Sequence, residues 1–374
     1  MRIICLIDSL GSGGAQRQMS YLAVLLKQAG HDVRLLKYHP LDFFEPFVVS
    51  KGVKVDALNG LPPLKRIRAV RAYIRNARPD AVIAFLSTPS LLAELSGLPT
   101  RRFKIIVSER SLDIRGPTLS TYRRLLFHAL ADHVVANSYS QADFIRRTAP
   151  WLAKKTTTIL NCVDLDEFSP TTSSTADNTR DLRFLVLASL SKWKNPVALV
   201  KALALLCKRR PDLEWSLDWY GNRLLRDGVP LPYSAFSETE VAIKAEGLES
   251  RLRLRDPCPA AAELYHAADA VILPSLFEGC PNVLCEAFAC GLPVLASRVG
   301  DIPRLVEDGV NGFLFDPRSP EDTCRSIEHF CDLTREQRLA MGKANREKAA
   351  KLFLFSRFLA EYELILMGLV QCSD

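Results

Sequence analysis

The chain has 374 residues, of which 48% are hydrophobic and 24% are charged. This ordinary globular composition excludes a disordered, collagen-like or coiled-coil protein, and the length predicts two or three domains. The formal net charge of +7 is uneven, because residues 1–170 carry ten more basic than acidic residues and residues 171–374 carry three more acidic than basic ones. A basic first half suggests an anionic partner, namely a membrane surface, a phosphorylated substrate or a nucleic acid, with an ordinary solvated surface as the alternative.

The ten cysteines contain no Cys-x-x-Cys pair, which argues against zinc or redox chemistry. Most lie in apolar surroundings, as Cys5 does within Ile3–Ile7, and are expected to be buried in a protein of a reducing compartment. No apolar run approaches the roughly 18–20 residues of a membrane-spanning helix, and no secretory signal precedes the first strand. We therefore expect a cytoplasmic protein, at most peripheral at the inner face of the cytoplasmic membrane.

The first half alternates short apolar strands with amphipathic helices. Ile3–Ile7 predicts a strand, Gly11–Gly14 a glycine-rich turn, Met19–Leu26 a helix, and Val33–Leu36 a second strand. Later strands are expected at Ala81–Phe85, Lys104–Ser108, His133–Ala136 and Thr156–Leu160. Later helices are expected at Leu64–Arg78, Leu91–Leu95, Thr121–Ala131 and Gln141–Arg147. This pattern predicts a doubly wound α/β domain with a parallel sheet buried on both faces.

The polar segment Ser169–Asp181 predicts a linker, after which a second α/β set begins. Its strands are expected at Phe184–Ala188, Glu214–Tyr220, Ala270–Leu273, Pro293–Ala296 and Gly312–Phe315. Its helices are expected at Val197–Lys208, Ala260–Ala268 and Val283–Cys290. A final helix, Arg357–Val370, carries an apolar stripe through Phe358 and Tyr362.

The most informative segment is Leu273–Val294, in which a strand ends in a short loop that holds Glu278. Pro281 is expected in the first turn of the helix that follows. The free N–H groups at this helix start would be those of Gly279, Cys280, Asn282 and Val283. Such groups can hold a phosphate or a sugar hydroxyl, while Glu278 and Glu286 can accept hydrogen bonds from hydroxyl pairs. Singly, each glutamate is more simply a helix-dipole or surface carboxylate, but the complete segment favours a ligand site.

This segment resembles the retaining glycosyltransferases of family 4, which have the GT-B fold. Their Glu-x7-Glu hallmark is met by Glu278 and Glu286. The similar surroundings comprise Leu273-Pro274-Ser275, Gly291-Leu292-Pro293-Val294, Asp308–Phe313, Gly13–Gln16, Ala136-Asn137-Ser138 and Leu160–Asp164. The resemblance covers nearly the whole chain. It implies two doubly wound Rossmann-like domains that face a cleft, with the C-terminal helix crossing back to the first domain.

The same resemblance implies a donor site for a nucleotide-sugar, with a UDP-sugar as the favoured donor, and without a metal ion or other cofactor. Glu286 would bind the ribose hydroxyls and Glu278 would touch the transferred sugar. Lys194 would neutralise the leaving diphosphate. The loop around Arg255 would meet the base. The implied donor-binding residues are Gly13, Gly14, Lys194, Arg255, Glu278, Gly279, Cys280, Pro281, Asn282, Val283 and Glu286.

The sequence departs from the family pattern in three places. Ala188-Ser189 replace the usual Gly-Arg, so one diphosphate cation is missing, and Lys192 or an arginine of the first domain would have to replace it. Cys162 lies where the family often has glycine. The histidine often found near the transferred sugar has no clear counterpart, and the matching strand ends in Glu109 and Arg110. These two residues join Glu278 and Lys194 as candidate catalytic residues, with a structural role as the alternative.

The turn Gly11–Gly14 also allows a dinucleotide-binding interpretation. However, Arg17 follows Gln16 where a third glycine should fall, and the second strand runs into Lys37 without an acidic residue. A dehydrogenase is therefore disfavoured. In a glycosyltransferase, Gly13 and Gly14 would line the cleft and let the backbone approach the sugar or the acceptor.

The basic residues of the first half gather on the predicted helix Leu64–Arg78 and at residues 101–104. In the family, the first domain binds the acceptor, which is often a membrane lipid or a lipid-linked saccharide. The helix, with Arg68, Arg71 and Arg75, is therefore expected to contact an anionic membrane. The alternative is an ordinary crossover helix that packs on the sheet. Nucleic acid is not expected as a partner, because no aromatic residues interleave with the basic ones.

We predict an acceptor-binding domain at residues 1–168, completed by residues 353–374, and a nucleotide-sugar-binding domain at residues 182–352. The predicted activity is sugar transfer, with retention, to a lipid-linked or saccharide acceptor in surface polysaccharide or lipopolysaccharide assembly. Two alternatives stay open. One is another GT-B enzyme, such as a nucleotide-sugar epimerase or a phosphorylase. The other is a non-catalytic GT-B subunit, which Ser189 in place of the arginine motivates.

Overall fold

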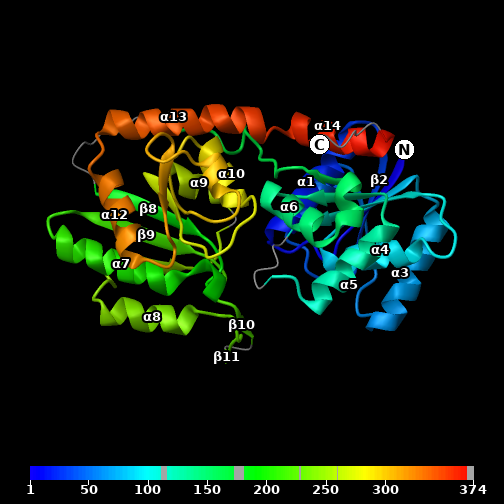
Figure 1. Cartoon of the computed structure of the whole chain (residues 1–374), viewed down its shortest axis with the longest axis horizontal. Helices are drawn as coiled ribbons and strands as arrows, with labels where there is room; N and C mark the ends of the chain where they lie inside the picture. The colour runs from blue at the N-terminus through cyan, green and yellow to red at the C-terminus, as the bar shows by residue number, and fades with distance from the viewer. Residues whose placement is uncertain (111–115, 172–180, 227–228, 259, 369–374) are drawn as a thin grey trace. The chain divides into compact units, whose positions relative to one another are not determined.

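The computed structural model describes residues 1–110, 116–171, 181–226, 229–258 and 260–368 (Figure 1). Contacts between residues divide the chain into two units, Met1–Cys162 with Phe355–Asp374, and Val163–Leu354. This boundary lies earlier in the chain than the predicted linker Ser169–Asp181, of which residues 172–180 fall outside the described part.

The first unit is built on a seven-stranded parallel sheet in the order β3-β2-β1-β4-β5-β6-β7. Its strands are β1 (Arg2–Leu6), β2 (Asp32–Lys37), β3 (Lys54–Ala57), β4 (Ala81–Phe85), β5 (Lys104–Glu109), β6 (His133–Ala136) and β7 (Thr156–Thr158). Its α-helices are α1 (Gly14–Gln28), α2 (Glu45–Ser50), α3 (Pro63–Ala77), α4 (Ser87–Ser96), α5 (Leu119–Phe127), α6 (Tyr139–Thr148) and α14 (Phe355–Met367). Two short 3-10 helices are η1 (His128–Leu130) and η2 (Pro150–Lys155). The strand order reverses between β1 and β4, as in doubly wound folds.

Alternating side chains of β1 feed two separate cores. Ile3 and Cys5 pack with side chains of α1 and α14, whereas Ile4 and Leu6 pack with side chains of α3 and α4. Because helices cover both faces of the sheet, its central strands are buried on both sides, as β4 is along its whole length, which accounts for the continuous apolar runs in the sequence. The chain returns to this unit at its end, where Tyr362 of α14 is fully buried in the first core. The expected return of the C-terminal helix is confirmed.

The second unit holds a six-stranded parallel sheet in the order β12-β9-β8-β13-β14-β15. The strands are β8 (Leu182–Leu187), β9 (Trp215–Tyr220), β12 (Leu252–Arg255), β13 (Ala270–Leu273), β14 (Val294–Ser297) and β15 (Gly312–Phe315). The helices are η3 (Lys192–Lys194), α7 (Pro196–Arg209), α8 (Phe236–Ala245), α9 (Ala261–His266), α10 (Asn282–Ala289), α11 (Ile302–Leu305), α12 (Pro320–Cys331) and α13 (Arg335–Leu352). A small antiparallel hairpin joins β10 (Leu225–Arg226) to β11 (Val229–Pro230). Two parallel sheets with helices confirm the predicted α/β class, and none of the described helices combines the length and apolar character needed to cross a membrane.

Helix α10, which carries Glu286, is held in place by α13. A Cβ on Gly342 of α13 would lie only 2.0 Å from the carbonyl oxygen of Gly291, so the glycine allows the backbones to approach closely. Three residues further along α13, the buried Asn345 donates to the carbonyl of Leu292 at 2.7 Å. A close backbone contact and a side-chain hydrogen bond therefore fix the turn after α10, which helps to position the helix.

Candidate active site

The loop between β13 and α10 forms the centre of the site. All four residues of β13 are buried, so the loop leaves a rigid central strand. Pro281 has an extended backbone and lies immediately before α10, one step earlier than the first-turn position that the sequence predicted. The N-cap residue Pro281 offers no side-chain cap, and the first turn of α10 holds no acidic residue. The positive end of α10 is therefore not neutralised by a carboxylate of its own, which suits an anionic ligand.

Lys194 reaches this loop from η3, which connects β8 to α7. The N–H of Leu276 donates to the carbonyl of Trp193 at 2.8 Å, so a backbone hydrogen bond joins the two loops. Nζ of Lys194 forms a very short hydrogen bond and ion pair with Oε1 of Glu278. The Lys194 side chain is 29% exposed and that of Glu278 is 10% exposed. The structure thus brings together two predicted catalytic residues that lie far apart in the sequence.

The main chain at Glu278 is held from the side of β14 and α11. A Cβ at Gly300 would lie 1.8 Å from the carbonyl oxygen of Glu278. Gly300 also has a positive φ of 53°, which favours glycine. This close backbone contact leaves the Glu278 carbonyl no room to move toward position 300, and the sequence did not predict it.

Glu286 lies inside α10 and is only 4% exposed. The hydroxyl of Tyr265, a fully buried residue of α9, donates to Oε2 of Glu286 at 2.7 Å. Phe168 packs edge-on against the Tyr265 ring at a centroid distance of 5.8 Å. A buried carboxylate with a fixed hydrogen-bond donor on one oxygen has a defined orientation, as a hydroxyl-binding group requires. The sequence missed Tyr265, because nothing in its apolar neighbourhood marks it as a partner of Glu286.

The predicted base-binding loop follows β12. The Arg255 side chain pairs with Asp218 of β9, with Nε 3.2 Å from Oδ1. Its carbonyl accepts from the N–H of Gly221 at 3.1 Å. The Arg255 side chain, which is 47% exposed, is thus paired with the neighbouring strand, and contact of this loop with a base stays a prediction.

The glycine-rich turn of the first unit lies between β1 and α1. Gly13 directly precedes α1, and Gly14 is its first residue. The Gln16 side chain folds back over Gly13, with Nε2 donating to Asp8 at 3.0 Å, and its Oε1 would be 2.2 Å from a Cβ at position 13. As at α10, this helix start has no side-chain cap and no acidic residue in its first turn.

Glu109 lies at the carboxyl end of β5, but it points into a buried cluster. Its Oε1 lies 2.9 Å from Nε2 of His128 and 3.1 Å from Nε of Arg124. The other His128 ring nitrogen, Nδ1, lies 2.6 Å from Oε1 of Glu94. The side chains of Glu94, His128 and Glu109 are at most 2% exposed. This environment favours the structural alternative for Glu109, and the cluster itself was missed by the sequence.

The charges of this cluster stabilise the protonated histidine. Burial alone would lower the pKa of His128, but hydrogen bonds to Glu109 and Glu94 outweigh it and raise the pKa to about 9. Burial raises the pKa of Glu94 above its usual value. The cluster is therefore a buried ionic network in which His128, like Arg124, is positively charged at neutral pH.

Arg110, the next residue, lies in a different network. Its guanidinium donates to Asn161 at 2.7 Å, to Ser108 at 2.9 Å and to the hydroxyl of Tyr362 at 3.1 Å. It also stacks on Phe85, with Cζ 3.9 Å from the ring centroid. Three hydrogen bonds and a stacked ring give Arg110 one orientation at the carboxyl end of the sheet.

Two family models match the chain in separate halves. The model described as "Glycosyltransferase Family 4" matches residues 12–167, and the one described as "Glycosyl transferases group 1" matches residues 181–332. Together they cover most of the chain and include every site residue that the sequence predicted. The chain belongs to the family 4 glycosyltransferases. The family places it among the sugar transferases, as the Glu-x7-Glu segment predicted.

Similar proteins of known name agree with this family. The glycosyltransferase is 31% identical over 205 residues to the D-inositol 3-phosphate glycosyltransferase of Corynebacterium kroppenstedtii, covering 52% of this chain and 44% of that protein. It is 29% identical over 262 residues to the enzyme of the same name from Corynebacterium diphtheriae, covering 65% and 59%. The chain thus spans about half the length of the curated relatives that it matches.

Solved structures support the fold. Anabaena HepE in complex with UDP-glucose superposes with a TM-score of 0.83 at 21% identity, covering 98% of this chain and 100% of that one. The sucrose-phosphate synthase of Thermosynechococcus elongatus gives a TM-score of 0.80 at 20% identity and covers both chains completely. At this level of identity the similarity establishes the GT-B fold of the glycosyltransferase and leaves its substrates to other evidence.

The structure shows what contacts the residues at which the sequence of the glycosyltransferase differs from the family pattern. The carbonyl of Ala188 accepts from Nε1 of Trp219 at 2.7 Å. Lys192, one candidate replacement for the missing cation, forms an exposed ion pair with Glu238 of α8, at 3.5 Å. Because an exposed ion pair of this kind contributes little, Lys192 stays a candidate for the missing cation. Cys162 is buried, and its backbone is held at both N–H and carbonyl by Gln18.

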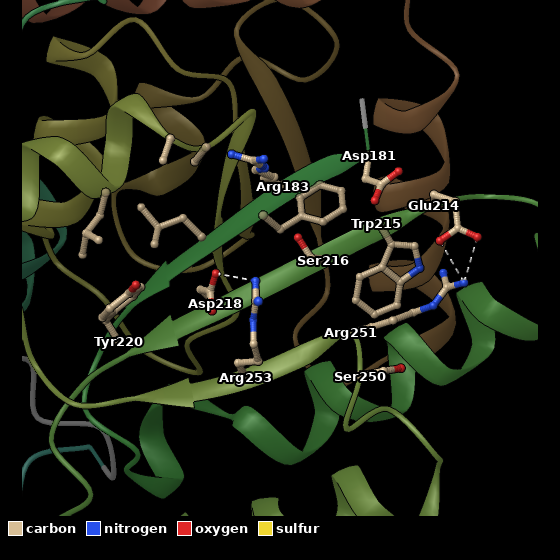
Figure 2. Close-up of a pocket in the computed structure, with 15 residues that line it drawn as sticks. Asp181, Arg183, Glu214, Trp215, Ser216, Asp218, Tyr220, Ser250, Arg251 and Arg253 are labelled. Atoms are coloured by element: carbon tan, nitrogen blue, oxygen red, sulfur yellow. Dashed lines mark hydrogen bonds and ion pairs between the residues drawn. The ribbon is translucent and has the colours of Figure 1, made fainter. Parts of the chain in front are cut away.

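A separate groove of about 590 Å³ lies along β8, β9 and β12 (Figure 2). Its charged side chains are largely paired with one another. Arg253 lies 2.9 Å from Asp218, and Arg251 lies 3.4 Å from Glu214. Because its lining includes neither Lys194 nor either glutamate of Glu-x7-Glu, the groove is a solvated face of the sheet rather than the predicted donor site.

Proposed function

We propose that the glycosyltransferase moves a sugar from a nucleotide-diphosphate-sugar, with a UDP-sugar as the favoured donor, to an acceptor with retention of configuration. The observation that carries this proposal is the ion pair of Lys194 and Glu278 in the loop that leads into α10. A cation and a helix N-terminus are the groups needed to stabilise a leaving diphosphate. The choice of uridine is supported by HepE, whose structure contains UDP-glucose.

The proposed roles follow from the surroundings of each side chain. Glu286, oriented by Tyr265, accepts hydrogen bonds from the ribose hydroxyls. Lys194 transfers its charge interaction from Glu278 to the diphosphate, and Glu278 then contacts the transferred sugar. The N–H groups from Gly279 to Val283 hold the diphosphate and the sugar. As the bond between the sugar and the diphosphate oxygen breaks, the acceptor hydroxyl forms its bond on the same face of the sugar, and its proton passes to the oxygen of the leaving diphosphate.

The proposed chemistry obtains its positive charge from Lys194 and the start of α10. We therefore propose that no metal ion takes part. Among the described residues, no group of three or more His, Cys, Asp or Glu side chains is arranged to hold one. The proposal is tested by transfer assays with and without EDTA and with added Mg²⁺ or Mn²⁺. A rate that requires either metal would contradict it.

The first unit is proposed to bind the acceptor. A lipid-linked or saccharide acceptor in surface polysaccharide or lipopolysaccharide assembly is the first candidate, with contact between this unit and an anionic membrane at the cytoplasmic face. A phosphorylated cyclitol is the second candidate, favoured by the names of the curated relatives and by the ten excess basic residues of residues 1–170. Both acceptors are anionic or are presented on an anionic surface.

The deciding experiment is a thermal-shift panel of uridine, guanosine, adenosine and cytidine diphosphates and their sugars, followed by transfer assays with the stabilising donor. Glu286→Ala is expected to weaken nucleotide binding, whereas Glu278→Ala is expected to reduce transfer more than binding. Nuclear magnetic resonance of the product reports the anomeric configuration. Tight donor binding without turnover across a panel of acceptors would instead identify a non-catalytic GT-B subunit, and isomerised donor sugar would identify an epimerase.

A further inference from the structure

Two cysteines face each other at the start of α10. Cys280 lies two residues before the helix, Cys285 is its fourth residue, and their Sγ atoms are 3.7 Å apart. Both side chains are buried. They occupy the two positions of a hydrophobic staple, a contact that fixes the angle at which the chain enters a helix. The contact between the two sulfurs therefore determines how the loop 278–281 leads into α10.

This pair of cysteines lies within the loop to which the proposed chemistry belongs. Cys280 follows Glu278 by two residues, and its own N–H is one of the groups proposed to hold the diphosphate. The Glu278 carboxylate pairs with Lys194, and the Glu278 carbonyl is in close contact with Gly300. A chemical change at the two sulfurs therefore acts directly on the loop that is proposed to bind the donor.

The two sides of the sulfur contact differ in their freedom to move. Cys285 belongs to a run of buried residues in α10, 284–289, and the turn after the helix is held by α13. The loop side is less enclosed, since Gly279 and Pro281, on either side of Cys280, are only half-buried. A covalent bond between the two sulfurs must therefore draw the loop toward the helix rather than the helix toward the loop.

We propose that Cys280 and Cys285 form a reversible redox modification site, and that their disulfide switches off donor binding. The inference rests on the proposed function in one respect, since it takes the loop 278–281 to hold the diphosphate. A disulfide bond is about 2.0 Å long, so the two sulfurs must approach each other by a further ~1.7 Å. The N–H groups of the loop move with Cys280, and a misplacement of about 1 Å in an active site can reduce the rate roughly 100-fold.

The oxidant in this step is a low-molecular-weight disulfide of the glutathione type. Cys280, on the loop side, loses its proton and attacks one sulfur of the oxidant, which releases a first thiolate. Cys285 then loses its proton and attacks Sγ of Cys280 in the mixed disulfide, which releases the second thiolate. The released thiolates take up the two protons, so two cysteine thiols are oxidised while one external disulfide is reduced to two thiols. In a reducing compartment the pair stays as thiols, and because closure displaces the loop, the disulfide is easily reduced again.

The test equilibrates the full chain in glutathione buffers of increasing oxidised fraction, alkylates the remaining thiols and digests the protein with trypsin. Cys280 and Cys285 are released in one peptide, residues 256–298, which also contains Cys258 and Cys290. The oxidised peptide is expected to contain one disulfide and to carry the alkyl label only on Cys258 and Cys290, which fragmentation in the mass spectrometer locates.

The same samples are assayed for sugar transfer and for the thermal shift caused by the nucleoside diphosphate of the four-base panel that stabilises the protein most. Oxidised wild type is expected to lose the nucleotide shift and to transfer sugar roughly 100-fold more slowly, and dithiothreitol is expected to restore both. The saturating nucleotide is expected to slow disulfide formation in proportion to its occupancy, because it holds the loop in its reduced geometry. A disulfide without effect on either readout, or a rate of oxidation that is insensitive to nucleotide, would contradict the switch.

Single variants separate the two cysteines. Cys285→Ala removes the second thiol, so oxidised glutathione is expected to remain as a mixed disulfide on Cys280. Cys280→Val and Cys280→Ser remove the first thiol, and for each the ratio of oxidised to reduced transfer rate is expected to be close to one, whatever the rate of the reduced variant. Cys207→Ala, at a half-buried cysteine of α7, is the matched control and is expected to respond to oxidation like the wild type. Inactivation of both Cys280 variants to the wild-type extent would overturn the proposal.

The mass measurement separates this inference from the proposed function, because it does not depend on activity. If the reduced wild type bound no nucleotide and transferred no sugar, but the peptide 256–298 still formed the disulfide, the proposed function would be refuted and the modification site would stand. If the reduced wild type transferred sugar but formed no disulfide between Cys280 and Cys285 in any glutathione buffer, this inference would be refuted and the proposed function would stand.

Discussion

Gly300→Ala tests whether the main chain at Glu278 must be held in place for sugar transfer. A Cβ at this position would lie 1.8 Å from the Glu278 carbonyl oxygen, whereas contacts under 3.0 Å are essentially never found. The two segments must therefore separate by about 1.2 Å, and no flexible side chain can absorb this change because the contact is to backbone. The displaced residue is the one whose carboxylate pairs with Lys194.

A displacement of about 1 Å in a catalytic group can reduce the rate roughly 100-fold, and we expect a loss of that size in the transfer rate of Gly300→Ala. The positive φ of Gly300 adds backbone strain of about 1–2 kcal/mol for alanine. Gly309 provides the matched control. Its φ is 77°, and nothing lies within 4 Å of a Cβ built there, so Gly309→Ala carries the strain without the clash.

The assay measures transfer rate, nucleotide affinity and thermal unfolding for both variants. Gly309→Ala is expected to lower the unfolding temperature slightly and to keep the wild-type rate. Gly300→Ala is expected to lose transfer beyond what its stability change explains. If the two variants transferred sugar at the same rate, the argument that the Gly300 contact positions Glu278 would be refuted.

Four further results are expected. Tyr265→Phe removes the hydrogen-bond donor to the buried Glu286, so it should destabilise the fold by about 1.5–3 kcal/mol and weaken nucleotide binding. The control Tyr233→Phe, at an exposed tyrosine, should change neither stability nor nucleotide binding. Thermal denaturation measures the stability, and isothermal titration measures the binding. Lys194→Ala should lower the transfer rate roughly 100-fold or more in steady-state assays, and a rate within a factor of a few of the wild type would contradict the proposed role. EDTA should leave the transfer rate unchanged. Finally, the pKa of His128 is about 9 in the folded protein and about 6.5 in the unfolded chain. The stability that this difference contributes is fully present below about pH 6.5 and is lost as the pH rises through about 9. Thermal unfolding measured across this pH range should show the loss, and His128→Gln should make the pH dependence flatter.

The strands that the sequence predicted well are those buried on both faces. Ala81–Phe85, His133–Ala136 and Ala270–Leu273 have the predicted bounds and are buried throughout, because a short apolar run between turn residues is typical of a central strand in an α/β protein. The edge strand β15 (Gly312–Phe315) also has the predicted bounds, because it too is apolar along its whole length. The sequence missed the hairpin strands β10 and β11 and two edge strands of the large sheets, β3 (Lys54–Ala57) and β12 (Leu252–Arg255). In β12 an arginine follows each leucine, and both arginines bind Asp218 of the neighbouring strand. Such strands depend on pairing with a neighbour that the sequence does not identify.

The site residues also fall into those that a local sequence pattern identifies and those that depend on tertiary packing. Glu278 and Glu286 are recognisable because their spacing belongs to one strand–loop–helix segment, which a local pattern can capture. The residues with which they pair in the fold are not recognisable from local sequence, even where, as with Lys194, the family resemblance had already marked the residue. Lys194 is 84 positions from Glu278, and the backbone bond from Leu276 to Trp193 that joins their loops leaves no trace in side-chain composition. Likewise, the packing of α4 and η1 on β5 determines the partners of Glu109. The local sequence around Glu109 therefore does not show that its side chain is buried.

The charge balance of the two units also has a structural basis. The unit with the excess of acidic residues carries the proposed diphosphate site, but there Lys194 is already neutralised by Glu278. A diphosphate that binds Lys194 must therefore replace a carboxylate, and the released Glu278 becomes available to sugar hydroxyls. This exchange makes donor binding depend on both the diphosphate and the sugar, since a nucleotide diphosphate alone leaves Glu278 partly buried without a cation. The sugar-containing donor is accordingly expected to bind more tightly than its diphosphate, and Glu278→Gln, which leaves no charge to compensate, should reduce or abolish that preference.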